Sequence, residues 1–148
     1  MRSLTLDPGS ALDRIELEDV AGADGLLFVR DRVGFAGRRV AARWAADEAV
    51  ARLSAIEHRD ESGIGRGPVA LGCLPFRPGA PAELVVPEVL VSRDRTGRTT
   101  VTVTSDGRLP DPDTVMNELT APIAAIPTRS ADYSVRPASP VTVHRDAV

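Results

Sequence analysis

An apolar run interrupted by proline constrains the fold of this chain more than any other feature. Residues 71–91 read LGCLPFRPGAPAELVVPEVLV, and one of the four prolines, Pro87, lies inside the second apolar run. Proline has no amide hydrogen for a sheet ladder, so it occurs at sheet edges, at bulges or where the amide faces outward. The stretch 83–93 therefore predicts a strand whose ladder is interrupted at Pro87.

The residues after this run predict a hairpin. Residues 98–105 alternate in polarity, with Val101 and Val103 on one face of the strand and three threonines on the other. The intervening sequence DRTG has glycine at its last position, which favours a turn. We therefore expect 83–105 to contain two antiparallel strands.

Three further segments predict strands, at 25–30, 33–38 and 68–76. Only Asp31 and Arg32 separate the first two segments, which predicts a two-residue hairpin although the favoured Asn-Gly or Asp-Gly pair is absent. The third segment is apolar enough to be a buried strand. Together with the hairpin, these segments predict a mainly antiparallel sheet.

The stretch 39–60 predicts one long amphipathic helix. Its apolar residues recur at helical spacing, and its charged residues fall largely on the other side. We expect Trp44 to anchor this helix to the sheet. The buried stripe comprises Ala42, Ala46, Ala49, Val50, Leu53 and Ile56.

Two further elements are expected towards the C-terminus. Residues 110–119 predict a short helix with Asp113 as its cap, and 131–139 predict an extended segment. Ser139 and Pro140 predict the N-cap and the first residue of another helix, which has only begun where the sequence ends.

Composition places the chain among globular proteins. Its 148 residues are 43% hydrophobic and 26% charged, with a net charge of −3, which argues against a nucleic-acid partner. No apolar run reaches the length of a membrane span or of a signal-peptide core, so we expect a cytoplasmic protein without a membrane partner. Cys73 is the only cysteine, which excludes an intramolecular disulfide.

The chain contains no lysine, because all 18 of its basic residues are arginine. It therefore has no Schiff-base lysine, no lysine general base and no P-loop lysine. Arginine stays protonated and does not replace lysine as a base. A reaction that needs a basic side chain whose pKa can be shifted into the working range, as that of lysine can, would have to obtain this base from outside the basic residues of this chain.

Two short motifs suggest sites but have simpler interpretations. The glycine-rich 63–67 (GIGRG) follows a predicted helix and precedes a predicted strand, whereas a dinucleotide-binding fingerprint follows a strand and opens a helix. We interpret it as a flexible connector. The acidic stretch 57–61 (EHRDE) contains His58. We interpret it as a solvated helix end, because no other part of the sequence supplies further ligands or catalytic side chains to it.

The remaining reactive residues are also interpreted structurally. Cys73 lies in an apolar segment, which predicts a buried thiol. Arg38, Arg39 and Arg43 fall at the predicted helix start, where cations oppose the helix dipole, so we expect salt bridges rather than an anion site. His144 is expected to be exposed. The residues alone therefore predict no catalytic, cofactor-binding or metal-binding side chain.

Two stretches nevertheless carry a resemblance to a known family. The segment 26–44 (LLFVRDRVGFAGRRVAARW) resembles the part of isochorismate synthases that leads through a Gly-Arg turn into their first long helix. The segment 67–94 is similar to their G-x-x-A-x-G-A-L-P-F-D-P-x-x-P-A-x-L-V-V-P pattern, with Cys73 in place of alanine and Arg77 in place of aspartate. The residues that match in order are Gly72, Leu74, Pro75, Phe76, Pro78, Pro81, Ala82, Leu84, Val85, Val86 and Pro87.

The resemblance extends to 133–148, where Val143 stands in place of a common tryptophan, and it implies an incomplete enzyme. Family members are two to three times this length, and fold as an α/β sandwich of two large, mostly antiparallel sheets. They interconvert chorismate and isochorismate with Mg²⁺, a lysine activating water and a glutamate acting as general acid. These residues lie in the later part of family sequences, so no catalytic or metal position transfers to this chain.

The sequence therefore predicts an α+β chain with two parts. Residues 1–24 are a poorly patterned N-terminal segment, which we expect to be only partly ordered. Residues 25–148 are expected to be the N-terminal portion of an isochorismate synthase-like domain, a partial α/β sandwich truncated at a helix start. This scaffold part would be inactive alone and would meet chorismate only with a separate catalytic C-terminal half.

An uncovered sheet would also allow the chain to associate with itself. Two alternatives stay open. One is a small non-enzymatic binding or regulatory module derived from the family, which would bury all its large apolar residues. The other is the N-terminal part of a different chorismate-utilising enzyme, namely anthranilate, aminodeoxychorismate or salicylate synthase.

Overall fold

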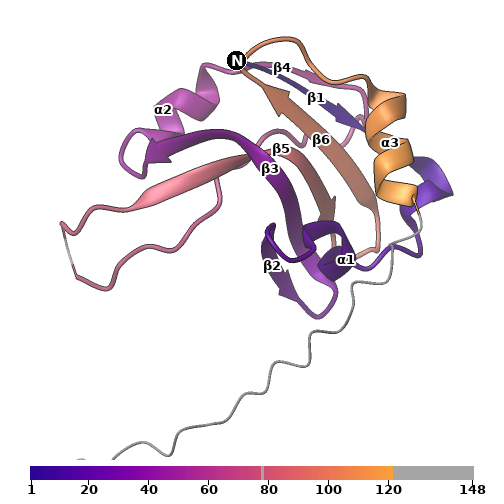
Figure 1. Cartoon of the computed structure of the whole chain (residues 1–148), viewed down its shortest axis with the longest axis horizontal. Coiled ribbons are helices and arrows are strands. Elements are labelled where there is room, and N and C mark those ends of the chain that lie inside the picture. The colour runs from indigo at the N-terminus through magenta and orange to yellow at the C-terminus, as the bar shows by residue number, and fades with distance from the viewer. Residues whose placement is uncertain (78, 122–148) are drawn as a thin grey trace, which may run out of the picture.

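The computed structural model describes residues 1–77 and 79–121 and has an α+β fold. Within these ranges six strands form one mixed, mostly antiparallel sheet in the order β2-β3-β5-β6-β1-β4 (Figure 1). The strands are β1 (Arg2–Leu6), β2 (Leu26–Arg30), β3 (Val33–Ala45), β4 (Glu57–Asp60), β5 (Glu83–Arg93) and β6 (Thr99–Ser105). The helices are the 3₁₀ turn η1 (Gly9–Leu12) and the short α-helices α1 (Leu17–Ala21), α2 (Ala49–Ser54) and α3 (Pro112–Thr120).

Both predicted hairpins are confirmed, as is the mainly antiparallel sheet. β2 pairs with β3 and β5 pairs with β6, each in an antiparallel register. The β2–β3 turn has positive φ angles of 53° at Asp31 and 64° at Arg32. These angles belong to a type I′ turn, which matches the twist of the flanking strands. The two-residue hairpin therefore forms without glycine in its turn.

The ladder of β5 is interrupted around Pro87. The residue opposite is Val40, and the register of β3 shifts between Val40 and Ala42. Val85 exchanges two backbone hydrogen bonds of 2.8 Å with Leu71. Because strand residues alternate, the backbone nitrogen of Pro87 faces the same side of β5 as the backbone groups of Val85. On that side Pro87 lies between the Leu71–Val85 bridge and the first residue paired with β6, Val89. The β3–β5 ladder therefore has a bulge next to Pro87, and the nitrogen of Pro87 faces a side on which no strand pairs with it. The alternative of an edge strand is not found, because β5 is internal to the sheet.

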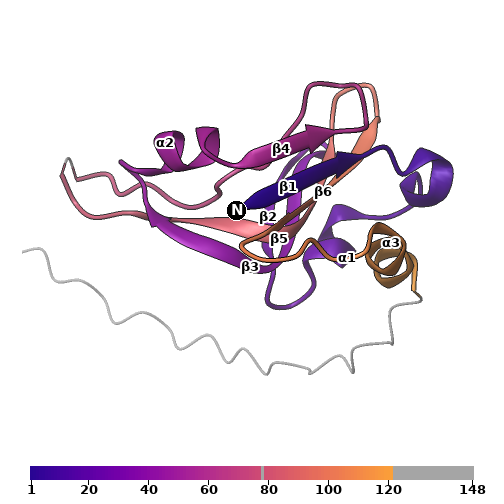
Figure 2. The same ribbon diagram turned by 90° about the horizontal axis from the view of Figure 1, so that it is seen from above.

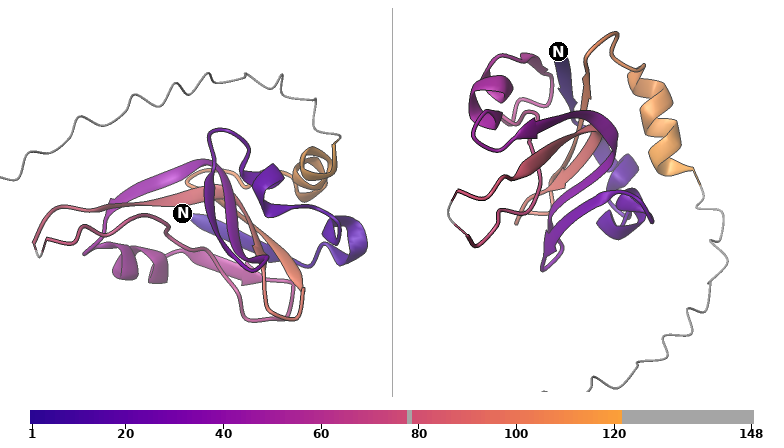
Figure 3. Two further views of the ribbon diagram at one scale, coloured as in Figure 1. Left: turned by 90° about the horizontal axis from the view of Figure 1, so that it is seen from below. Right: turned by 60° about the vertical axis from the view of Figure 1, so that its left-hand side comes forward.

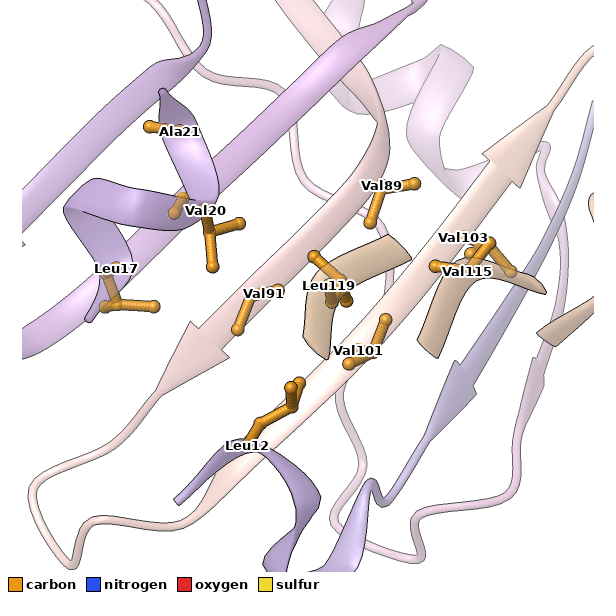
Figure 4. Packing of buried hydrophobic residues seen from close by; sticks show 11 residues of the cluster. Leu12, Leu17, Val20, Ala21, Val89, Val91, Val101, Val103, Val115 and Leu119 are labelled. Carbon is orange, nitrogen blue, oxygen red and sulfur yellow. The ribbon is translucent and has the colours of Figure 1, made fainter. Parts of the chain in front are cut away.

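One face of the sheet carries the main hydrophobic core. Val89 and Val91 of β5 lie beside Val101 and Val103 of β6, and η1, α1 and α3 cover them (Figure 4). The helical side of this cluster comprises Leu12, Leu17, Val20, Ala21, Val115 and Leu119. The predicted common face of Val101 and Val103 is therefore confirmed, and it faces the interior.

The opposite face is polar but is also buried. The hydroxyl of Thr102 lies 2.7 Å from that of Thr5, and the hydroxyl of Thr100 lies 2.6 Å from that of Ser92. These hydrogen bonds offset the cost of burying the hydroxyls. A second apolar cluster lies on this face, and α2 lies on this side of the sheet, away from α1 and α3 (Figures 2 and 3). That cluster contains Trp44, Ile56 and Val86.

The prediction of one long helix over 39–60 is wrong. β3 continues through Ala45, α2 occupies only Ala49–Ser54, and β4 follows at Glu57. The ladder with the apolar β5 outweighs the helical pattern, because intrinsic propensities differ by less than about 1 kcal/mol per residue. Trp44 does pack with residues around α2, but it does so from β3.

Three smaller predictions also need correction. The segment 68–76 forms no strand and contributes only the bridge between Leu71 and Val85. The segment 1–24 is not loosely ordered, because it supplies β1, η1 and α1. The predicted helix at 110–119 is confirmed as α3, but its cap is Asp111, whose carboxylate accepts the amide hydrogen of Thr114 at 3.0 Å.

The extended segment expected at 131–139 and the helix expected from Ser139 lie outside the described residues. None of the helices in the described ranges has the length and apolarity needed to cross a membrane.

Candidate functional site

The glycine-rich loop 63–67 surrounds a carboxylate of its own chain. Asp60 accepts hydrogen bonds from the amide of Ser62 at 2.9 Å, the hydroxyl of Ser62 at 2.6 Å and the amide of Gly65 at 2.7 Å. The Ser62 hydroxyl and these amides lower the pKa of Asp60. The amide of Gly65 is therefore engaged by Asp60, and the loop forms a connector that follows β4.

The acidic stretch 57–61 lies on and just after the edge strand β4, not at a helix end. Glu57 pairs with Arg2 at 3.2 Å, and Glu61 pairs with Arg59 at 2.7 Å. Within the described residues, no group of three or more His, Cys, Asp or Glu side chains could hold a metal ion. The carboxylates of this stretch are thus engaged locally by arginines and by the glycine-rich loop.

His58 and Ser3 form the pair that most resembles a catalytic arrangement. The hydroxyl of Ser3 lies 2.6 Å from Nδ1 of His58, and Nε2 of His58 lies 2.8 Å from the carbonyl oxygen of Arg66. A carbonyl can only accept, so Nε2 carries a hydrogen and donates it to Arg66, while Nδ1 and the Ser3 hydroxyl share the other hydrogen bond. A nucleophile and its base need this contact.

Burial excludes a nucleophilic role for Ser3 in this fold. Its exposed fraction is 2%, so a substrate cannot reach its hydroxyl. Ser3 lies on β1 opposite His58 on β4. The pair therefore joins these two parallel strands and ties the loop at Arg66 to them.

The three arginines expected at a helix start lie on β3. Arg39 donates to Glu118 of α3 at 2.8 Å and to Glu88 of β5 at 3.1 Å, while Arg43 donates to Glu83 at 3.1 Å. The salt bridges expected for the three arginines are found for Arg39 and Arg43. Glu118 raises the pKa of Arg39 above its ordinary value.

Arg38 instead donates to the backbone carbonyls of Asp19 and Val20 at the end of α1. It thereby holds α1 against β3 and satisfies carbonyls that the helix leaves open. Its guanidinium is engaged by these carbonyls.

Arg93 is a buried arginine that the sequence analysis did not single out. It is 7% exposed and donates to the carbonyl oxygens of Leu12 and Ile15 at 3.3 and 2.7 Å. It thereby fixes the N-terminal segment against the end of β5. It stands just after an apolar run, where an arginine normally marks the end of a buried strand, so the sequence offered no signal of this contact.

The clearest unexplained surface is the segment 72–77, here called the apolar loop. Cys73 is exposed there, so the prediction of a buried thiol is wrong. Leu74 is 69% exposed and Phe76 is fully exposed. Figure 1 shows the chain between β4 and β5 extending beyond the sheet at this point. The loop offers apolar contact area rather than acid–base chemistry.

A hollow of about 500 Å³ lies between the apolar loop and the end of β3. Leu74, Pro75 and Arg77 line it from the loop, and Ala45 and Asp47 line it from the end of β3 and the turn that follows. The prolines mark this segment in the sequence, but its apolar residues predicted a buried strand, which is not found. His144, expected to be exposed, lies outside the described residues.

Comparison with protein-family models, with curated proteins and with solved structures finds no match in any of the three.

Proposed function

We propose that this chain is the N-terminal scaffold part of an isochorismate synthase-like enzyme. The proposal is carried by the ordered match of 67–94 to the pattern of that family. It is supported by the place of the motif, which runs from the apolar loop into the central strand β5. On this proposal the complete enzyme converts chorismate to isochorismate with Mg²⁺, and this chain contributes structure rather than catalysis.

The absence of lysine supports a scaffold rather than a catalyst. The family chemistry needs a lysine to activate water, and arginine stays protonated at working pH. The one histidine–hydroxyl pair in the described ranges, His58 with Ser3, joins β1 to β4. Because Ser3 is buried, this pair is not accessible to a substrate. A separate chain with the catalytic half would have to supply the acid, the base and the magnesium ligands.

The exposed side chains of the apolar loop support an incomplete assembly. Leu74 and Phe76 belong to the matching motif, and their exposure leaves apolar area in water. A self-sufficient regulatory module was expected to bury all its large apolar residues, and these two do not meet that condition. We therefore keep the enzyme scaffold as the single proposed function.

The first test is an activity assay on the purified chain. We expect no conversion of chorismate to isochorismate with Mg²⁺ present. Measurable turnover by the chain alone, proportional to its concentration and retained through purification, would refute the proposed role as a non-catalytic part.

The second test supplies the missing half. The C-terminal half of a complete isochorismate synthase, inactive when expressed alone, is co-expressed with this chain. We expect co-purification and the appearance of chorismate-converting activity. Phe76→Ser should weaken the complex, whereas Val50→Ser, which changes an apolar side chain 76% exposed on α2, should not. Failure of the two chains to associate would count against the proposal.

A further inference from the structure

The two edges of the sheet differ in chemistry. β4 forms one edge, and its residues Glu57–Asp60 are all charged or histidine. β2 forms the other edge with the sequence LLFVR. Natural sheets protect their edges with charges because an unpaired strand can pair with another chain. β4 has this protection, whereas β2 has it only at Arg30.

The turn geometry identifies which backbone groups of β2 are free. In a two-residue hairpin the residues that flank the turn, here Arg30 and Val33, form a hydrogen-bonded pair. Because strand residues alternate, the backbone N–H and C=O of Phe28 point towards β3, and those of Leu27 and Val29 point away from β3, to the open edge of the sheet. The position of Gly34 agrees, because a Cβ there would lie 1.9 Å from the carbonyl oxygen of Phe28.

No hydrogen bond outside the β2–β3 ladder engages the backbone of Leu27 or Val29 within the described ranges. Each residue presents one N–H and one C=O at the edge. The side chain of Leu27 is 42% exposed, and that of Phe28 is 40% exposed. β2 thus offers free main-chain groups and apolar side chains at the same place.

We propose that two copies of this chain pair through β2, antiparallel and about a two-fold axis, to form one continuous sheet. Leu27 of one copy lies opposite Val29 of the second copy, and the reverse pair is made by symmetry. This register engages both N–H groups and both C=O groups of each strand, which makes four main-chain hydrogen bonds. This pairing goes beyond the proposed function and does not depend on it.

The same register gives each side chain a suitable neighbour. Phe28 lies directly opposite Phe28 of the second copy in a non-hydrogen-bonded pair, next to the Phe28–Phe35 pair already present within each copy. Antiparallel pairing also brings the end of β2 that carries Arg30 to the end preceded by Asp24 in the second copy. The end with Arg30 also carries Asp31, which pairs with Arg30 at 3.8 Å, and Arg32, so it keeps one net positive charge opposite the negative charge of Asp24. This opposite net charge at both ends favours a second copy over a strand of unrelated sequence.

The oligomeric state tests the proposal directly. Sedimentation velocity and light scattering over a concentration series should show a reversible dimer. Leu27→Lys places a charge on the edge and should raise the dimer dissociation constant about tenfold or more. Val50→Lys makes the same kind of change on α2, away from β2, and should leave the constant unchanged.

Val29→Pro supplies a second variant with a different basis. It removes an outward-facing N–H, which an edge strand tolerates, and also some packing of Val29 against the main core. The monomer should therefore be less stable but still folded by circular dichroism, while dimerisation is lost. A chain that is monomeric at all concentrations would overturn the proposal. A dimer that survives both Leu27→Lys and Val29→Pro would also overturn it, because its interface would lie elsewhere.

A disulfide test distinguishes the register. In a Cys73→Ser background, Phe28→Cys should form a covalent dimer under mild oxidation, because opposed Cα atoms in a non-hydrogen-bonded pair lie about 4.5 Å apart. Leu27→Cys is the matched control and should cross-link far less, because it faces Val29 of the second copy. Equal cross-linking of the two variants would contradict the proposed register.

Discussion

At the scale of single residues, Pro87 is accommodated by a glycine as well as by an interrupted ladder. A Cβ on Gly37 of β3 would lie 2.7 Å from Cγ of Pro87 and 2.9 Å from its Cβ. The proline ring therefore occupies space that only glycine leaves free. Gly37 and Pro87 act as one packing unit, although fifty residues separate them in the sequence.

This packing predicts a coupled effect. Gly37→Ala should destabilise the chain by about 1–3 kcal/mol, because a methyl group is forced against the proline ring. In a Pro87→Ala background the same change should cost less, because the ring atoms are gone. Urea denaturation of the four chains of this double-mutant cycle measures the coupling. Gly107→Ala is a control, because a Cβ there meets nothing within 4 Å. Equal costs in the two backgrounds would contradict the contact.

The carboxylate of Asp60 predicts a pH dependence. Its pKa is lowered in the folded chain, first by the Ser62 hydroxyl and then by backbone amides. A carboxyl group whose folded pKa lies below its unfolded value stabilises the fold at pH values above about 4, and this contribution is lost as the pH falls through the lower folded pKa. Asp7 and Asp94 have lowered pKa values for similar reasons, chiefly the amide of Gly9 and the hydroxyl of Thr96.

We expect Asp60→Asn to lower the melting temperature at pH 7. Between pH 5 and pH 3 the melting temperature of this variant should fall by less than that of the unchanged chain. Thermal denaturation followed by circular dichroism across this range measures both effects. Asp47→Asn, at an exposed position before α2, serves as the matched control. An unchanged pH profile for Asp60→Asn would show that the glycine-rich loop is not organised by this carboxylate.

At the scale of elements, the contrast between 39–60 and 98–105 shows when periodicity is decisive. Strict alternation in 98–105 predicted β6 correctly, because only a strand places every second residue on one face. In 39–60 the alanines fit a helical stripe, yet Ala42 and Trp44 also share one face of a strand, opposite Val86 and Leu84 of β5. Alanine marks the faces of an element weakly, so the pattern did not separate the two structures.

The N-cap of helix α3 was predicted at Asp113 but is Asp111, two residues earlier. Asp111 precedes Pro112 at the first helical position, and its carboxylate also accepts the Thr114 hydroxyl at 2.9 Å. Asp111→Ala should reduce the free energy of unfolding by about 1 kcal/mol. Asp113→Ala should cost only about 0.3 kcal/mol, because Asp113 merely favours the positive end of the helix. Urea denaturation decides between them, and a larger cost for Asp113→Ala would restore the cap predicted from sequence.

At the scale of the whole molecule, the N-terminal segment completes the core. Leu12, Leu17 and Val20 come from residues that look weakly patterned, and each is at most 1% exposed against the sheet. β1 is an internal strand that pairs with β6 on one side and with the edge strand β4 on the other, so the first residues of the chain are part of the sheet. Short elements can be essential when their few apolar residues all point to one cluster.

This role predicts unequal effects of the same substitution. Leu12→Ala should destabilise the chain by about 2–5 kcal/mol, because it leaves a cavity in the main core. Leu74→Ala in the apolar loop should change stability by less than about 0.5 kcal/mol, because that side chain is mostly exposed. Urea denaturation of both variants measures the difference. A small effect of Leu12→Ala would mean that the N-terminal segment is not part of the cooperative core.

The local sequence pattern was enough to predict the α+β class, both hairpins, the separation of valines from threonines on β6 and the interruption of the ladder at Pro87. These features depend on local alternation, on turn chemistry and on the missing amide hydrogen of proline. Three further features became known only from the folded chain: residues 39–45 extend a strand, the threonine face is buried, and Asp60 accepts the amide hydrogen of Gly65 in the glycine-rich loop. The strand at 39–45 and the buried threonine face depend on partners distant in the sequence, whose pairing free energy exceeds the small local preferences. The hydrogen bonds to Asp60 come from the nearby residues Ser62 and Gly65, but no sequence pattern marks them.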